Sequence, residues 1–103
     1  MIKIVKNESQ IKISGHALYA EKGKDIVCAS VSSIIYTTVN GLLNINPKSI
    51  LFSDNDEYME IKIVLKDNIT NALIENMMTL LTQLAKSYPK NIKVDIKNNS
   101  KGE

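Results

Sequence analysis

Apolar and polar residues alternate at the start of the chain, which is the pattern of β-strands with one buried face. Ile2 and Ile4 lie on either side of a lysine, and Ile11 and Ile13 repeat this arrangement after the polar segment KNES. The two stretches are therefore predicted to form a β-hairpin. Its second strand is expected to end between His16 and Tyr19.

The hydrophobic period lengthens to three or four residues in the segment DIVCASVSSIIYTTVNGLL. The valine, isoleucine and threonine content of this segment favours a strand, but its length and its period favour a helix over residues 26–43. Asp25 is expected to cap the N-terminus of this helix, and NGLLNINP contains stop signals. The expected buried stripe consists of Val27, Val31, Ile34 or Ile35, Thr38 and Leu42.

A second hairpin is predicted over residues 49–66, with its turn at Ser53–Asp56. A second helix is predicted over residues 69–88, with Asn68 as its N-cap and the sequence YPKN at its end. One face of the hairpin's second strand should carry Met59, Ile61, Ile63 and Leu65. The apolar face of the helix should consist of Ile69, Leu73, Met77, Leu80, Leu81 and Leu84.

A last strand is predicted in the segment IKVDIK, with Ile92, Val94 and Ile96 directed inward. The predicted order of elements is then β-β-α-β-β-α-β. Two helices that cover one face of a mostly antiparallel sheet make a two-layer α+β domain. Residues 1–97 are predicted to form this single domain, and residues 98–103 a frayed tail.

All thirteen basic residues are lysines, and the net charge is only +2. Proteins that bind nucleic acids cluster their basic residues and use arginine forks on phosphates and bases, so this composition argues against direct nucleic-acid binding. A single cysteine excludes an intramolecular disulfide, and MIKIVKNESQ has no signal-peptide core. These two features together predict a cytoplasmic protein.

A membrane span is suggested by the run from Ile26 to Pro47, which has no charged side chain and is long enough to cross a bilayer. The same run contains eight serine, threonine and asparagine residues. So many hydroxyl and amide groups make insertion into lipid unfavourable. The run is therefore predicted to be a helix packed in a small domain, with no membrane contact.

Metal and cofactor motifs are not found in the sequence. One histidine and one cysteine, without HxxxH or CxxC spacing, do not supply a zinc site. The chain contains no GxxxxGK[ST] or GxGxxG phosphate loop and no GxSxG serine nucleophile. Asp54, Asp56 and Glu57 are interpreted as a solvated turn rather than a pair of catalytic carboxylates. No cofactor is expected.

His16 and Cys28 remain as the candidate chemistry. With Asp25 as the N-cap, Cys28 falls at the third helical position, among backbone N–H groups that lack intrahelical acceptors. The helix dipole at that end favours negative charge and thus the thiolate. A histidine folded back over the helix start would serve as general base and acid.

Two other interpretations of the same cysteine stay open. Cysteine is among the most buried residue types, so Cys28 is also compatible with a structural position in the core of a non-catalytic domain. The second alternative interpretation is that Cys28 is a redox-sensing thiol. Reactivity of Cys28 in the folded protein separates these interpretations.

The motif around these two residues resembles that of the bacterial ribosomal-processing cysteine proteases. That family carries GHA, a variable loop and GxDIVCA[AG]VS. This sequence has Gly15, His16 and Ala17, followed by Gly23 and then Asp25–Ser32. The visible departure is a serine at position 30, where the family pattern has alanine or glycine.

The resemblance implies a cysteine endopeptidase that removes a short N-terminal extension from a ribosomal protein of the large subunit. It further implies a homodimer and a mobile loop over the active site, which we expect within residues 17–24. By the same carry-over, Cys28 is the nucleophile and His16 the general base and acid. Gly15 and Gly23 frame the loop. Asp25 either caps the helix or orients His16, and Ser32 either bonds the backbone carbonyl of Cys28 or supports the site. The alternative to the protease is a non-catalytic ribosome-associated or peptide-binding module in which Cys28 is structural.

Overall fold

The computed structural model describes residues 1–15, 22–55 and 57–97, with the backbone alone for residues 22–25. Its elements are β1 (Ile2–Lys6), β2 (Gln10–Ser14), α1 (Lys22–Ile45), β3 (Ile50–Asp54), β4 (Tyr58–Ile63), α2 (Asn68–Ser87) and β5 (Ile92–Ile96). This is the predicted order, and the predicted α+β class is confirmed. The six residues of the predicted tail, 98–103, lie outside the described part of the chain.

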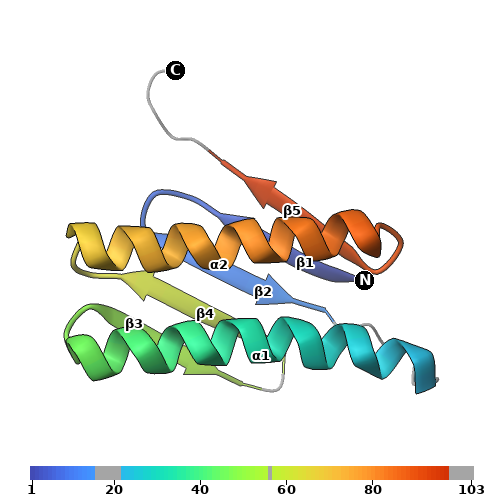
Figure 1. Ribbon diagram of the computed structural model, residues 1–103, viewed down its shortest axis with the longest axis horizontal. Helices are drawn as coiled ribbons and strands as arrows, with labels where there is room; N and C mark the ends of the chain where they lie inside the picture. Colours follow the sequence, from blue (N-terminus) through green and yellow to red (C-terminus); the bar gives the residue numbers. More distant parts are fainter. Residues whose placement is uncertain (16–21, 56, 98–103) are drawn as a thin grey trace.

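The sheet has five strands in the order β3-β4-β2-β1-β5. Neighbouring strands are antiparallel except β1 and β5, which pair in parallel, so the sheet is mixed. The connection from β4 to β5 runs through α2 in the helical layer. A helical crossover of this kind brings the chain back to the sheet in the same direction, which allows β5 to pair in parallel. Figure 1 shows α1 and α2 side by side over one face of the sheet. The two-layer architecture thus matches the expectation.

The core lies between this helical layer and the sheet. Alternation places Ile2 and Ile4 of β1, and Ile11 and Ile13 of β2, on the covered face. On α1 the buried stripe is the expected one, with Val39 in place of Thr38. Its members are Val27, Val31, Ile35, Val39 and Leu42. The helical segment Ile26–Ile45, taken as a whole, carries no charged side chain and is by length and composition apolar enough to cross a membrane, a test that the core helix of a soluble protein also passes.

The apolar face of α2 is rotated relative to the prediction. Ile69 and Leu80, expected to be buried, are 54% and 40% exposed. Ile74 and Met78 are buried instead, together with Thr70, Met77 and Leu81. Both stripes have helical spacing, so the period does not distinguish them. Contact with α1 and β5 selects the observed face, since these are the neighbours of α2 in the helical layer and at the sheet edge.

The ends of several elements differ from the prediction. α1 begins at Lys22, so Asp25 lies inside the helix and is not its N-cap. α2 is capped by Asp67 rather than Asn68, because Asp67 Oδ1 accepts a hydrogen bond from the Thr70 backbone N–H at 2.8 Å. This bond lowers the pKa of the Asp67 carboxyl. β2 ends at Ser14, before the predicted range, since Gly15 leaves the extended conformation with φ at +81°.

Two predictions at the sheet edges are also wrong in detail. The β3–β4 turn begins at Asn55, because β3 continues through Ser53 to Asp54. In β5, Ile92 is buried and Val94 is half-buried, but Ile96 is 52% exposed. β5 is an edge strand of the sheet, so its last residue has a neighbouring strand on one side only.

Candidate active site

A cavity of about 250 Å³ opens between α1 and the β3–β4 turn. Its floor is apolar and consists of Ile2, Ile13 and Met59, which come from β1, β2 and β4. Register explains why these side chains meet: Ile13 pairs with Met59 across β2 and β4, so both point to the covered face of the sheet. The floor of the cavity is therefore an extension of the hydrophobic core between the helices and the sheet.

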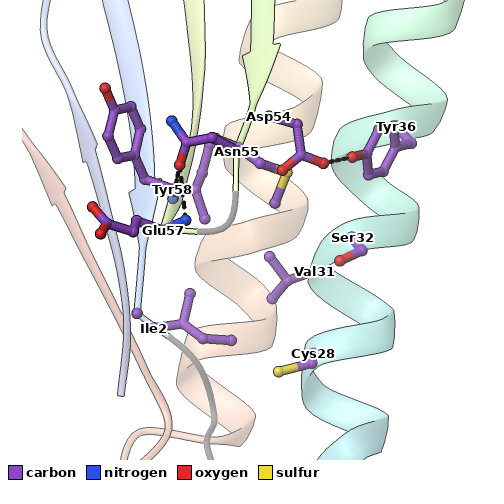
Figure 2. A pocket seen from close by; sticks show the side chains of 12 residues that line it. Ile2, Cys28, Val31, Ser32, Tyr36, Asp54, Asn55, Glu57 and Tyr58 are labelled. Carbon is purple, nitrogen blue, oxygen red and sulfur yellow. Dashed lines mark hydrogen bonds between the residues drawn. The ribbon is translucent and has the colours of Figure 1, made fainter.

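The α1 wall of the cavity is formed by Cys28, Val31, Ser32 and Tyr36. Residues separated by three or four positions project from one face of a helix, and this set follows that spacing. Val31 is buried and anchors the face on the core, while Cys28 and Ser32 are half-buried. In Figure 2 the sulfur of Cys28 extends from α1 toward the sheet. The thiol is thus presented at the cavity wall.

The opposite wall is the β3–β4 turn, which is held by its own hydrogen bonds. Asn55 Oδ1 accepts from the backbone N–H groups of Glu57 and Tyr58, at 2.8 and 3.0 Å. The Asn55 N–H donates to the Tyr58 carbonyl at 3.0 Å, which closes the turn. This side-chain-capped turn presents the backbone and side chains of Asp54, Asn55 and Glu57 to the cavity.

A hydrogen bond between described residues joins the two walls. The hydroxyl of Tyr36 on α1 donates to the carboxylate of Asp54 at the end of β3 (Figure 2). The Tyr36 ring also packs edge-on against Phe52, with 5.5 Å between the ring centroids and an interplanar angle of 81°. These contacts connect the helix to β3 at the end of the cavity away from Cys28.

The charged side chains that line the cavity, among the residues whose side chains are described, are the carboxylates of Asp54 and Glu57. Lys12, on β2, lies with its Nζ 4.2 Å from the centroid of the Tyr58 ring and is not part of the lining. Both acidic residues are exposed, as the interpretation of this segment as a solvated turn requires. The cavity therefore combines an apolar floor with an acidic rim.

Three of the six site residues named from the sequence line this cavity: Gly15, Cys28 and Ser32. His16 lies outside the described residues. Gly23 and Asp25 lie on α1, in the part where the backbone alone is described. Of the expected loop, residues 17–21 lie outside the described part, and residues 22–24 are helical rather than loop.

The expected location of Cys28 in the first turn of the helix is wrong. Because α1 begins at Lys22, Cys28 is its seventh residue. Backbone N–H groups at that depth bond to carbonyls four residues earlier, so they are not open donors. Cys28 therefore does not lie among unsatisfied backbone N–H groups. The additional helical turn at residues 22–25 was not visible in the sequence, because KGKD lacks an apolar stripe.

Sequence reasoning also missed Tyr36 and the participation of the β3–β4 turn. Tyr36 follows Cys28 by eight positions, which is close to two helical turns, so the spacing on a helical wheel was a usable signal. No comparable signal existed for Asp54. Its proximity to α1 depends on how the second hairpin packs against the first helix.

Residues 1–93 match the family model of cysteine protease Prp. A ribosomal processing cysteine protease Prp from Mycoplasma genitalium is 38% identical over 97 residues, covering 92% of this chain and 95% of the relative. The corresponding protein of Staphylococcus aureus is 29% identical over 92 residues, covering 86% of this chain and 87% of the relative.

Solved structures show the same fold. The ribosomal processing protease Prp of Staphylococcus aureus, crystallised with a covalently linked product peptide, superposes with a TM-score of 0.85 at 23% identity, covering 94% of this chain and 100% of that one. A crystal structure of a Streptococcus mutans protein gives a TM-score of 0.77 at 26% identity, covering 95% of this chain and 93% of that one.

Proposed function

This chain belongs to the cysteine protease Prp family, and we propose that it removes the N-terminal extension from a ribosomal protein of the large subunit. Relatives that it matches over most of their length are named ribosomal processing cysteine proteases. The protein of the same fold from Staphylococcus aureus was crystallised with a product peptide and with a substrate peptide. A peptide is therefore the class of substrate that these relatives support.

Cys28 is the proposed nucleophile, and the observation that carries this proposal is its position on the wall of the cavity. The thiol lies at an opening of about 250 Å³ with an apolar floor, which offers room for a substrate side chain next to the sulfur. It is the only cysteine of the chain, so a cysteine protease of this sequence has one candidate for its nucleophile.

The proposed reaction is acyl transfer in two steps. The Cys28 thiolate attacks the scissile carbonyl carbon, and the carbonyl oxygen becomes an oxyanion. His16, as imidazolium, then gives its proton to the leaving amine nitrogen, and the C–N bond breaks to leave a thioester. In the second step neutral His16 takes a proton from water, and the hydroxide attacks the thioester carbonyl carbon. The C–S bond breaks to regenerate the thiolate, and the carboxylic acid product loses its proton to solvent.

Supporting roles are assigned to the other motif residues. Gly15 directly follows β2 and precedes His16, and its φ of +81° is a conformation that glycine adopts without strain. Ser32 lies one turn after Cys28 and lines the same cavity, where its hydroxyl is available to a bound peptide. Asp25 is proposed to orient His16 rather than to cap the helix, and Gly23 to permit adjustment of the segment before Cys28.

We further propose that the protein is a cytoplasmic homodimer. The support is the uncharged run from Ile26 to Pro47 in a chain whose residues are 23% charged, because the cores of protein interfaces are depleted in charge. Part of this run is the exposed face of α1. A second copy of the chain covering that face would remove it from water. Light scattering across a concentration series measures this directly, and a constant monomer mass rejects the dimer.

The deciding experiment is incubation with the extended ribosomal protein, comparing the wild type with Cys28→Ala and His16→Ala. We expect the wild type to release the extension and Cys28→Ala to leave it intact while remaining folded, since a thiol is replaced by a hydrogen. His16→Ala should lose turnover and keep binding. Ser30→Ala is the matched control, because Ser30 Oγ donates to the Ile26 carbonyl at 2.8 Å and does not line the cavity.

The alternative, a peptide-binding module with a structural cysteine, makes the opposite prediction. In that case neither the wild type nor Cys28→Ala cleaves the extended protein, and both bind it equally. Cleavage by both variants would show that a different group is the nucleophile. Either result rejects the proposed mechanism.

A further inference from the structure

The cavity has a second end, at the hydrogen bond between Tyr36 and Asp54. Tyr36 follows Cys28 by eight residues on the same helix, and both line the cavity. At a rise of about 1.5 Å per residue, the two positions are about 12 Å apart along α1. Figure 2 shows Cys28 at one end of the row of α1 side chains and the Tyr36–Asp54 pair at the other.

We refer to the cavity, with Cys28 at one end and the Tyr36–Asp54 pair at the other, as the groove. A peptide bound along the groove would reach from one end to the other. An extended chain advances about 3.3 Å per residue, so about 12 Å corresponds to three or four residues. With the scissile carbonyl at Cys28, the side chain that meets Tyr36 and Asp54 belongs to a residue three or four positions away. The position of the nucleophile therefore fixes which substrate residue the far end of the groove can select.

The chemistry of this end favours a cation. An ionised carboxylate accepts hydrogen bonds at two oxygens, so a carboxylate bonded to one tyrosine hydroxyl retains acceptor capacity. Asp54 is in this situation, and Glu57 on the same rim adds a second negative charge. The described lining contains no lysine. Proteins neutralise nucleic-acid phosphates with lysine and arginine side chains, so a ribosomal protein that contacts RNA is a substrate with cations to offer.

We propose that Asp54 and Tyr36 form a terminal subsite that binds a lysine or arginine side chain of the substrate, three or four residues from the scissile bond. Asp54 forms the ion pair with the substrate cation. Tyr36 is a positioning residue, because its hydroxyl holds the carboxylate in place and its ring is fixed on Phe52. This assignment rests on the proposed peptidase function of the groove.

The test is a set of peptides around one cleavage site, with lysine, glutamine or glutamate at the third and fourth positions on either side. We expect the wild type to show a KM two- to fivefold lower for lysine than for glutamine on one side only, the range of exposed ion pairs. Asp54→Asn should raise the KM of the lysine peptide with little change in kcat and should remove the preference. Added salt should weaken the preference in the wild type.

Two further variants test whether Tyr36 acts only by positioning Asp54 and whether the lysine preference comes only from the net charge of the protein. Tyr36→Phe retains the ring contact with Phe52 and loses only the hydroxyl, so it should reduce the preference less than Asp54→Asn. Asp95→Asn removes an exposed carboxylate on β5, at the opposite edge of the sheet from β3, and should leave the preference unchanged. Equal loss of preference in Asp95→Asn would assign the effect to net charge and overturn the subsite.

Binding and cleavage, measured separately, distinguish an absent subsite from an absent peptidase activity. The same peptides, labelled with a fluorophore, are titrated with Cys28→Ala, and their anisotropy reports binding without cleavage. Cleavage by the wild type with equal KM for lysine and glutamate rejects the subsite alone. Charge-dependent binding to Cys28→Ala without cleavage by the wild type rejects the peptidase alone. Neither cleavage nor charge-dependent binding rejects both.

Discussion

Cys28 and Tyr36 lie two helical turns apart on one face of α1, with the buried side chain of Val31 between them. Val31 is packed in the core, so the face that carries the thiol cannot rotate away from the sheet without exposing an apolar residue. The direction of the thiol is thus a consequence of core packing. This relationship makes the cavity a groove along α1 rather than an isolated pocket at one residue.

The first prediction concerns access to this groove. Ser32→Leu adds a branched apolar side chain at a half-buried position of the cavity wall and should lower kcat/KM for the peptide about tenfold or more, by displacing the substrate from the sulfur. Its neighbour Ser33 is exposed and lies outside the lining, so Ser33→Leu is the matched control. Equal activity of the two variants would show that the peptide does not occupy this cavity.

The second prediction concerns Gly15, whose φ of +81° lies in the left-handed region. A Cβ at this position would clash with the carbonyl oxygen of Met1 and lie 3.3 Å from its carbonyl carbon. Left-handed backbone alone costs about 1–2 kcal/mol for a residue with a Cβ, and the clash adds to this. Gly15→Ala should therefore lower the melting temperature and displace the segment that leads to His16.

Gly41 provides the control for this substitution. It lies within α1, and a Cβ built there has no described neighbour within 4 Å. Gly41→Ala should stabilise the protein by about 0.5–1 kcal/mol, because alanine loses less backbone freedom than glycine on forming a helix. Thermal unfolding of both variants measures the contrast. A Gly15→Ala variant as stable as the wild type would contradict the close approach to Met1.

The third prediction distinguishes the two candidate faces of α2. Ile74 is 3% exposed and Ile69 is 54% exposed. Ile74→Ala should destabilise the protein by about 2–5 kcal/mol, through lost burial and a residual cavity. Ile69→Ala, the same substitution on the same helix, should change stability by about 0.5 kcal/mol or less. Denaturant unfolding measures both, and the reverse order would restore the face that the sequence pattern favoured.

The fourth prediction is a pH dependence at the N-cap of α2. The hydrogen bond from the Thr70 backbone N–H lowers the pKa of the Asp67 carboxyl below its ordinary value of 3.8. A depressed pKa in the folded state adds stability above the ordinary value, and this stability is lost as the pH falls through the folded pKa. Asp67→Ala should therefore melt below the wild type at pH 7, with a smaller difference at about pH 3.

Asp67→Asn separates the hydrogen bond from the charge. Asparagine is also a good N-cap, so this variant should keep most of the stability at pH 7. Because its amide does not titrate, its stability should not carry the pH dependence of this site. A wild type and an Asp67→Asn variant with the same pH profile would show that Asp67 does not contribute through its ionisation.

Much of the fold was accessible from the sequence because its signals are local. The alternation around Ile4 and Ile13 and the three-to-four period around Val31 each determine one element, and their order specifies the α+β class. The motif from Gly15 to Ser32 identified the family without any structure. Cys28 stood out for a simple chemical reason, since it is the chain's only thiol.

What the sequence determined by itself was therefore the type and order of the elements and the residue proposed as nucleophile, because periodicity and residue chemistry are properties of short segments. The tertiary structure decided which face of α2 is buried and where α1 begins. It also decided that Asp54 meets Tyr36 across a cavity. These depend on contacts between segments distant along the chain, where several local patterns satisfy the same spacing and packing selects one.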